Sequence, residues 1–298
     1  MREGNKMLEI KQLNKSYGKN RVLMNLDLQI EENKIYGLLG RNGVGKTTLL
    51  NILASQIVKD SGEIKLDQQD IFENNKAMEE ICFVKDRGIA MDDEKVKKLF
   101  EVAAALYKNW DEEYKDKLVK EFKLDVRKKY KKLSRGYQTM VGLIIGMASR
   151  SRITIFDEPS LGLDAAYRYK FYNMLLEDYD RYPRTIIIST HLIDEVSNLF
   201  EEIIILDEGK IMLQETTDSL MKKAWFLSGR EENLKGILKN KTVISKETFG
   251  ATDIVGIFNE ITEEENKKIR KLGIEIAHIP LQKLFVYLTE NINSREVI

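Results

Sequence analysis

The sequence predicts an α/β fold built on a parallel β-sheet, with smaller segments attached to it. Four short apolar segments alternate with stretches of helical periodicity; they span residues 35–39, 153–156, 185–189 and 203–206. Such alternation is typical of a parallel sheet with helices on its faces. The first apolar segment also runs into a glycine-rich loop, which a helix starting near Lys46 and ending near residue 56 follows.

Two further segments have a different pattern. Residues 8–30 alternate apolar and polar side chains on either side of a turn at Tyr17-Gly18-Lys19-Asn20, which predicts an antiparallel pair of strands. Residues 92–131 carry apolar residues at helical spacing among dense charge and end in a basic run, RKKYKK. We expect this second segment to be a helical insertion of two or three helices.

The pattern changes again after residue 220. Weak strands are expected at 224–227, 253–258 and 275–278, with charged helices at 263–271 and 280–289, and Thr262 with Glu265 would cap the first helix. We therefore predict two domains, 1–220 and 221–298. The second is a small α+β domain, and the first contains a helical subdomain at about 87–150.

Composition limits the partners that we expect. Lys+Arg and Asp+Glu both number 48, so no basic excess indicates nucleic acid. The single cysteine, Cys82, fits a reducing compartment. The longest apolar stretch, 140–148, is far shorter than the roughly 20 residues of a membrane span, and the N-terminus lacks the apolar region of a signal peptide. If the chain acts at a membrane, a partner must supply the spans.

The glycine-rich loop, GRNGVGKT, fits the phosphate-binding pattern G-x-x-x-x-G-K-[ST]. Its glycines let backbone N–H groups approach phosphate oxygens, and the helix that follows directs its positive end toward the same charge. Lys46 is predicted to reach the β- and γ-phosphates and the Thr47 hydroxyl to bind Mg²⁺. The predicted nucleotide-contacting residues here are Gly40, Arg41, Asn42, Gly43, Val44, Gly45, Lys46, Thr47 and Thr48. The loop alone does not separate an ATPase from a GTPase or a small-molecule kinase.

An apolar segment ends in two carboxylates, Asp157 and Glu158. A buried strand can place Asp157 beside the phosphates as an outer-sphere Mg²⁺ ligand, and Glu158 is then positioned to polarise the attacking water. An acidic turn is the simpler interpretation of this pair on its own.

A second anion site is predicted at residues 133–138, LSRGYQ, which open a helix. The hydroxyl of Ser134, the glycine N–H groups and the helix N-terminus could together bind phosphate, although Ser134 could also be only an N-cap. SLGLD follows the two carboxylates at 160–164, and His191 follows the next apolar strand.

Together these segments resemble the nucleotide-binding subunit of ABC transporters over residues 8–220. GRNGVGKT resembles the Walker A loop, LSRGY the signature motif, ITIFDE Walker B, SLGLD the D-loop, and His191 the switch histidine. The resemblance implies a P-loop NTPase of the ABC type that binds ATP and Mg²⁺. It also implies that Asp157, Glu158 and His191 are catalytic and that Tyr17 stacks on adenine; a turn tyrosine is the alternative for Tyr17.

The sequence departs from the family pattern at three positions. Asp86 stands where the family has a glutamine; its carboxylate can contact Mg²⁺ or water, so it joins Thr47 and Asp157 as a predicted metal ligand. Arg135 replaces a glycine and Tyr137 a glutamine in the signature motif. Arg135 could add a charged contact to phosphate.

The resemblance also implies an assembly. Two cassettes, identical or different, would pair head to tail, with ATP between the phosphate loop of one and Ser134, Arg135 and Gly136 of the other. An ABC-2-type permease would hold the pair at the cytoplasmic face of the membrane, and the helical insertion would transmit closure to it.

Residues 106–125, LYKNWDEEYKDKLVKEFKLD, are similar to ATPases encoded beside GntR-type regulators and to those of phenol-soluble modulin exporters of Gram-positive bacteria. This favours export of amphipathic peptides, such as phenol-soluble modulins or antimicrobial peptides. Export of antibiotics and lipid handling stay open. Two alternatives are a soluble ABC ATPase that acts on ribosomes or DNA, and a nucleotide-regulated binding module with weak hydrolysis.

Overall fold

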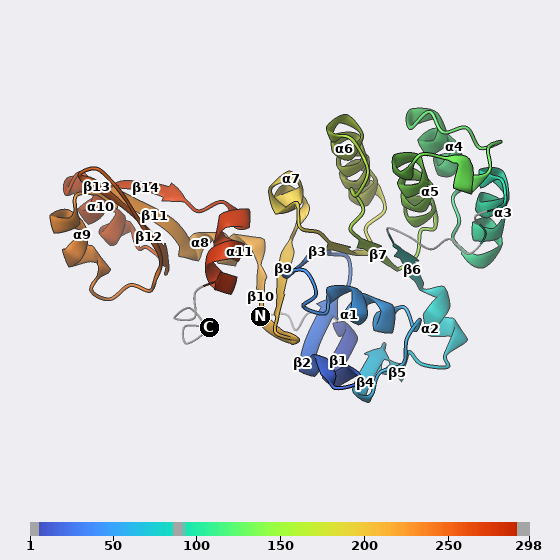
Figure 1. The fold of residues 1–298 in the computed structure, drawn as a ribbon, viewed down its shortest axis with the longest axis horizontal. Coiled ribbons are helices and arrows are strands. Elements are labelled where there is room, and N and C mark those ends of the chain that lie inside the picture. The colour runs from blue at the N-terminus through green and yellow to red at the C-terminus, as the bar shows by residue number, and fades with distance from the viewer. Residues whose placement is uncertain (1–5, 86–90, 92, 291–298) are drawn as a thin grey trace.

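The computed structural model describes residues 6–85, 91 and 93–290 and confirms the predicted α/β class. The chain forms three β-sheets, with the helices α3 and α4 at one end of the molecule and the third sheet at the other (Figure 1). The strands are β1 (Lys6–Tyr17), β2 (Asn20–Glu31), β3 (Ile35–Leu39), β4 (Ser61–Leu66), β5 (Gln69–Asp70), β6 (Ile81–Val84), β7 (Ile153–Asp157), β8 (Thr185–Ser189), β9 (Glu202–Asp207), β10 (Lys210–Thr216), β11 (Ala224–Gly229), β12 (Val243–Phe249), β13 (Thr252–Phe258) and β14 (Glu275–His278). The helices are α1 (Lys46–Leu53), α2 (Asn75–Glu79), α3 (Val96–Leu106), α4 (Glu112–Glu121), η1 (Tyr130–Lys132), α5 (Arg135–Ala148), α6 (Ala165–Arg181), α7 (Ile193–Val196), η2 (Ser197–Leu199), α8 (Thr217–Lys223), α9 (Glu231–Leu238), α10 (Glu263–Lys271) and α11 (Leu281–Glu290).

The central sheet positions the candidate site. Its strand order is β10-β9-β3-β8-β7-β6, and all neighbours are parallel except β10, which runs antiparallel to β9 at the edge. All five residues of β3, β7 and β8 are buried, as expected for strands covered on both faces. Because parallel strands end at the same edge, the loops after β3, β7 and β8 lie together.

The first sheet is antiparallel, with the order β2-β1-β4-β5, and it confirms the strand pair expected at 8–30. Gly18 and Lys19 form the turn between β1 and β2, and Gly18 takes a φ of 60°, a conformation that glycine adopts at no steric cost. The inward side chains of this first sheet pack with α1 and the near face of the central sheet into one apolar cluster. This sheet therefore supports the helix that carries the phosphate loop.

The helical insertion contains α3, α4 and η1, and its side chains pack against α5. The expected helix near Lys46 is shorter than predicted, because α1 ends at Leu53 rather than near residue 56. Ser55, two residues later, has a φ of 50°, which a continuing right-handed helix does not allow.

The third sheet has the order β12-β13-β11-β14 and is antiparallel. The predicted capping box is present: the Thr262 hydroxyl accepts a hydrogen bond from the Glu265 N–H at 3.2 Å, and Glu265 Oε2 accepts one from the Thr262 N–H at 3.0 Å. The sequence interpretation missed β12, an edge strand whose side chains are mostly exposed and which therefore lacks a clear apolar alternation.

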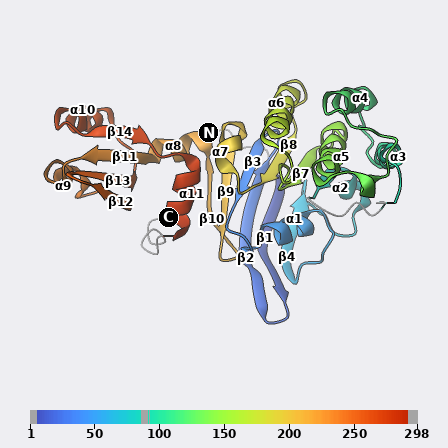
Figure 2. The same cartoon turned by 45° about the horizontal axis from the view of Figure 1, so that its top comes forward.

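The last helix, α11, leaves the third sheet and returns to the central sheet (Figure 2). Its apolar face joins the same core as Ile193, Leu199 and Phe200; the buried residues of that face are Leu281, Leu284, Phe285 and Leu288. The predicted boundary after residue 220 falls inside α8, so the division into two domains stays a prediction. Within the described part of the chain, no helix combines the length and apolarity that a bilayer span requires.

Candidate active site

The phosphate loop connects β3 to α1 at the edge of the central sheet. Gly43 and Gly45 have φ values of 80° and 115°, in the region that side chains rarely enter. A Cβ on Gly40 would lie 2.6 Å from the Leu206 carbonyl oxygen, so the loop also needs glycine for space. The glycine pattern of the sequence therefore has a steric cause at each of these three positions.

Lys46 is the buried cation of the loop. Its Nζ donates hydrogen bonds to the carbonyl oxygens of Gly40 at 2.6 Å and Arg41 at 3.2 Å. Burial lowers the pKa of Lys46, and the charges of Glu158 and Asp157 partly offset that effect. A desolvated ammonium held by its own loop is suited to bind an anion such as phosphate.

Thr47 and Asp157 meet across the ends of α1 and β7. The Thr47 hydroxyl donates to Asp157 Oδ2 at 2.9 Å, and Asp157 Oδ1 is buried without a hydrogen-bond partner. A buried carboxylate oxygen without a partner is costly, and a hydroxyl with a carboxylate is a ligand pair suited to a hard cation. The two residues therefore fit Mg²⁺. No group of three or more His, Cys, Asp or Glu residues that could hold a metal ion by itself occurs in the ranges that the structure describes.

Glu158 and His191 form the second close pair. Oε2 of Glu158 lies 2.7 Å from Nδ1 of His191, and the Glu158 N–H donates to the Ser189 carbonyl oxygen at 2.8 Å. Glu158 has a φ of 53°, a value that is uncommon outside glycine. The hydrogen bond from its N–H to Ser189 helps to hold this backbone conformation. Burial is the main cause of a raised pKa at Glu158, opposed by the nearby His191 and Lys46. The side chain is thus a stronger base than an exposed glutamate.

These groups line one pocket of about 290 Å³, whose lining residues are Val22, Asn42, Gly43, Gly45, Lys46, Thr47, Thr48, Asp157 and Glu158. A cation, a metal-ligand pair and a basic carboxylate converge on this pocket. These are the functional groups that phosphoryl transfer to water requires. The sequence interpretation missed Val22, which reaches the pocket from β2 and carries no local signal of its own.

The signature segment lies elsewhere in this chain. Ser134 is the N-cap of α5 and is exposed, and none of residues 134–136 lines the pocket. A Cβ on Gly136 would lie 2.7 Å from the Gly162 carbonyl oxygen, and Thr139 donates to the Leu161 carbonyl oxygen at 2.9 Å. The start of α5 is therefore packed on the 160–164 loop, which begins two residues after Glu158.

Two predicted residues, Tyr17 and Arg41, lie away from these contacts. Tyr17 ends β1 and is 51% exposed, with the Lys15 ammonium 5.4 Å from its ring; it does not line the pocket. Arg41 extends from the loop with its Nη2 atom 4.0 Å from Glu290. Asp86, predicted as a metal ligand, lies outside the described residues.

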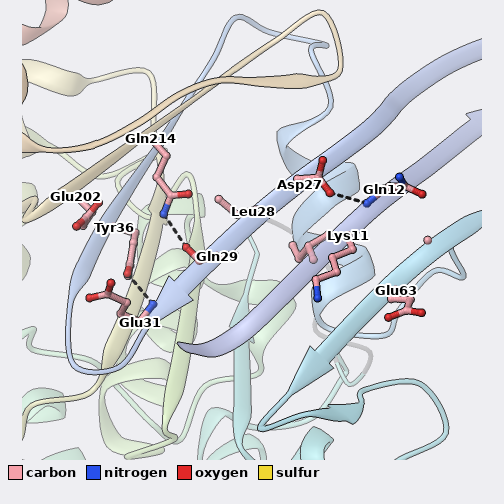
Figure 3. Close-up of a pocket in the computed structure, with 12 residues that line it drawn as sticks. Lys11, Gln12, Asp27, Leu28, Gln29, Glu31, Tyr36, Glu63, Glu202 and Gln214 are labelled. Carbon is pink, nitrogen blue, oxygen red and sulfur yellow. Dashed lines mark hydrogen bonds between the residues drawn. The ribbon is translucent and has the colours of Figure 1, made fainter. Parts of the chain in front are cut away.

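A larger hollow, of about 1000 Å³, lies between the first sheet and the edge of the central sheet (Figure 3). Gln214 Nε2 donates to the Gln29 carbonyl oxygen at 2.6 Å and the Glu31 N–H donates to the Tyr36 hydroxyl at 2.8 Å along its wall. None of the predicted site residues lines it, so size alone does not mark the active site.

The chain is similar to known proteins in sequence and in fold. The ABC transporter family profile matches residues 23–161. The ABC transporter ATP-binding protein YtrB of Bacillus subtilis is 29% identical over 292 residues, which cover 94% of this chain and 97% of YtrB. The lantibiotic transport ATP-binding protein SrtF of Streptococcus pyogenes is 29% identical over 251 residues, with 80% and 99% covered. A probable sulfate/thiosulfate import ATP-binding protein, CysA of Chlorella vulgaris, is 31% identical over 209 residues, with 68% and 88% covered.

A solved structure of the ATP-binding subunit of an ABC transporter superposes with a TM-score of 0.65 at 20% identity, covering 72% of this chain and 91% of that one. The fold and the relatives together define the class of protein: an ATP-binding cassette. The chain belongs to the ATP-binding subunits of ABC transporters, ATPases that are coupled to transport and work with transmembrane permeases.

Proposed function

We propose that the chain is the ATP-hydrolysing subunit of a peptide exporter, with Glu158 as the general base and His191 as its partner at the γ-phosphate. The observation that carries the catalytic part of this proposal is the 2.7 Å contact between the Glu158 carboxylate and the His191 ring beside the buried Lys46. The base, which contacts the histidine, and the phosphate-binding cation then line the same pocket.

The steps follow from the positions of these groups. ATP binds with its β- and γ-phosphates over the loop, where Lys46 transfers its ammonium from loop carbonyls to phosphate oxygens. Glu158 accepts the proton of the attacking water, because its raised pKa makes it a stronger base. The His191 ring orients the Glu158 carboxylate and contacts the γ-phosphate. Positioning and charge stabilisation supply most of the rate in such sites.

Thr47 and Asp157 are the residues that would hold Mg²⁺. When bound, the ion neutralises charge on the phosphate oxygens. The Thr47 hydroxyl and the Asp157 carboxylate would hold the ion together, because they already lie within hydrogen-bond distance of each other.

The complete site contains a second cassette. Ser134 is exposed at the N-terminus of α5 and does not line the pocket of its own chain. Its proposed phosphate contact is therefore with the ATP of a partner cassette. The 160–164 loop, packed on Gly136 and Thr139 of the same chain, then connects the Glu158 of one ATP site to the Ser134 segment that completes the other site. The pair is either homomeric or heteromeric.

We further propose an ABC-2-type permease that holds the pair at the cytoplasmic face of the membrane, and amphipathic peptides as the exported cargo. The similarity of residues 106–125 to modulin exporter ATPases supports the cargo, as does the relative that is named for lantibiotic transport. Cells that lack the gene should accumulate a labelled amphipathic peptide, and the wild-type gene should reverse this. Equal accumulation with and without the gene would contradict peptide export.

The catalytic part is tested with Glu158→Gln. This variant should bind ATP with wild-type affinity, while the loss of the general base lowers turnover by about 10²- to 10⁴-fold. Glu73→Gln is a matched control, because Glu73 is an exposed glutamate that also has a positive φ, 54°, but lies outside the pocket. Near-normal turnover of Glu158→Gln would remove Glu158 from its role.

A further inference from the structure

The short helix α7 begins two residues after His191 and does not cap itself. Its N-cap residue is Leu192, whose side chain cannot accept a hydrogen bond, and the helix has only four residues. A single helical turn is unstable on its own, since nucleation costs more than one turn of hydrogen bonds returns. Contacts from outside must therefore hold both α7 and the loop that carries His191.

One such contact comes from the far end of the chain. Gln282, in the first turn of α11, accepts a hydrogen bond from the Ile193 N–H at 3.1 Å through its Oε1 atom. An amide oxygen from a residue 89 positions away thus satisfies the N–H of the first residue of α7, one of the donors that a helix leaves without an intrahelical partner, while the Leu192 side chain supplies no cap.

Packing fixes Gln282 in that position. The buried face of α11, which includes Leu281 and Leu284, lies in the same core as Ile193 and Val196 of α7. On the other side of α7, Glu195 pairs with Arg168 of α6 at 3.0 Å. The pair of Arg41 with Glu290, at 4.0 Å between two side chains that are each 59% exposed, adds little by comparison.

We propose that Gln282 is a positioning residue for His191, through which the C-terminal helix α11 sets the geometry of the hydrolytic site. This inference rests on the proposed role of His191. In this arrangement α11 fixes the start of α7, and α7 fixes the backbone at 191–193. That backbone sets the angle of the His191 ring toward Glu158. Contacts with ATP itself do not involve Gln282.

The test compares variants of the full-length chain in steady-state ATP hydrolysis. Gln282→Met keeps the length of the side chain but removes the acceptor, and Gln282→Glu keeps an acceptor oxygen. We expect Gln282→Met to lower kcat by about 2- to 10-fold, the effect of one hydrogen bond, with KM for ATP unchanged. Gln282→Glu should restore kcat. Gln214→Met is the matched control, since it removes another glutamine side-chain bond, to Gln29, outside the pocket.

A second measurement separates positioning from general stability. The chain has two histidines, so the ring-proton NMR signal of His191 can be assigned with one His278 variant. Gln282→Met should shift the His191 signal at an unchanged thermal unfolding midpoint. If Gln282→Met destabilises the chain, the His191 signal and kcat are measured for Gln282→Ala and Gln282→Glu instead, at temperatures below the unfolding transition.

Wild-type kcat in Gln282→Met, or an equal loss of kcat in Gln282→Met and Gln282→Glu, would overturn the proposed role of Gln282. If His191→Ala is inactive in the same assay, the proposed function stands in spite of that result. Full turnover of His191→Ala would overturn the proposed role of His191, and the inference with it.

Discussion

Nδ1 of His191 lies 2.7 Å from Oε2 of Glu158, although the two residues are 33 positions apart and follow different strands. The contact exists because β7 and β8 are adjacent parallel strands, so their ends meet at one edge of the sheet. The raised pKa of Glu158 and the left-handed backbone at the same residue occur at this contact. The candidate general base is therefore held by both its backbone and its side chain.

The pKa of Glu158 predicts the acid limb of the pH profile. Burial raises this pKa above the ordinary value of 4.5, so on acidification Glu158 becomes protonated earlier than an exposed glutamate and can no longer accept a proton from water. kcat should fall as the pH drops, with a midpoint above 4.5. Turnover is measured across the range with circular dichroism as the folding control. A residual rate in Glu158→Gln with the same acid limb would assign that limb to another group.

Assembly of the site from two cassettes predicts complementation. Lys46→Ala should abolish phosphate binding in its own chain, and Ser134→Glu should repel the phosphate bound by the partner. In a homomeric pair, each variant alone should be inactive, whereas an equal mixture that exchanges subunits should regain roughly a quarter of the wild-type rate, since half of the random pairs then hold one intact site out of two. A mixture as inactive as its components would argue against the trans contact of Ser134.

Tyr17 is exposed, which leaves its ring free to stack on a base. Tyr17→Ala should weaken ATP binding by about 1–3 kcal/mol, and Tyr17→Phe should bind normally, because stacking needs only the ring. Tyr169→Ala, at another exposed tyrosine, is the control. Unchanged affinity in Tyr17→Ala, measured by titration calorimetry, would make Tyr17 only a turn residue.

Removal of the Asp178 carboxylate should have a large effect on the free energy of unfolding. Its buried carboxylate lies between two arginines: it pairs with Arg150, and it lies 2.9 Å from Arg184. Asp178→Ala leaves the buried Arg184 guanidinium without its carboxylate partner and leaves the partly buried Arg150 with Asp111 alone, so it should lower the free energy of unfolding by about 3–5 kcal/mol. Asp180→Ala, at an exposed aspartate of the same helix, should change it by less than about 0.5 kcal/mol. Urea unfolding measures both, and a loss below about 1 kcal/mol at Asp178 would contradict the argument.

Local patterns predicted much of the fold. The limits of β3, β8, β14 and α10 agree with expectation, and the Thr262 capping box is present. These features depend on residues within one short window, where apolar periodicity and cap residues act directly. By contrast, β12 was missed because its side chains are mostly exposed, and the extent of α1 was overestimated because its end depends on the backbone of Ser55.

The sequence by itself determined which functional groups the site contains: a loop that needs glycine at Gly43 and Gly45, the cation of Lys46, and the two carboxylates at the end of β7. Only the tertiary structure decided which groups touch. The bond from Ile193 to Gln282, the return of α11 to the core, and the contact of Glu158 with His191 each join segments that are far apart in the chain. Periodicity and motif spacing describe neighbours along a strand or helix, whereas these contacts arise from strand order and from the packing of apolar faces.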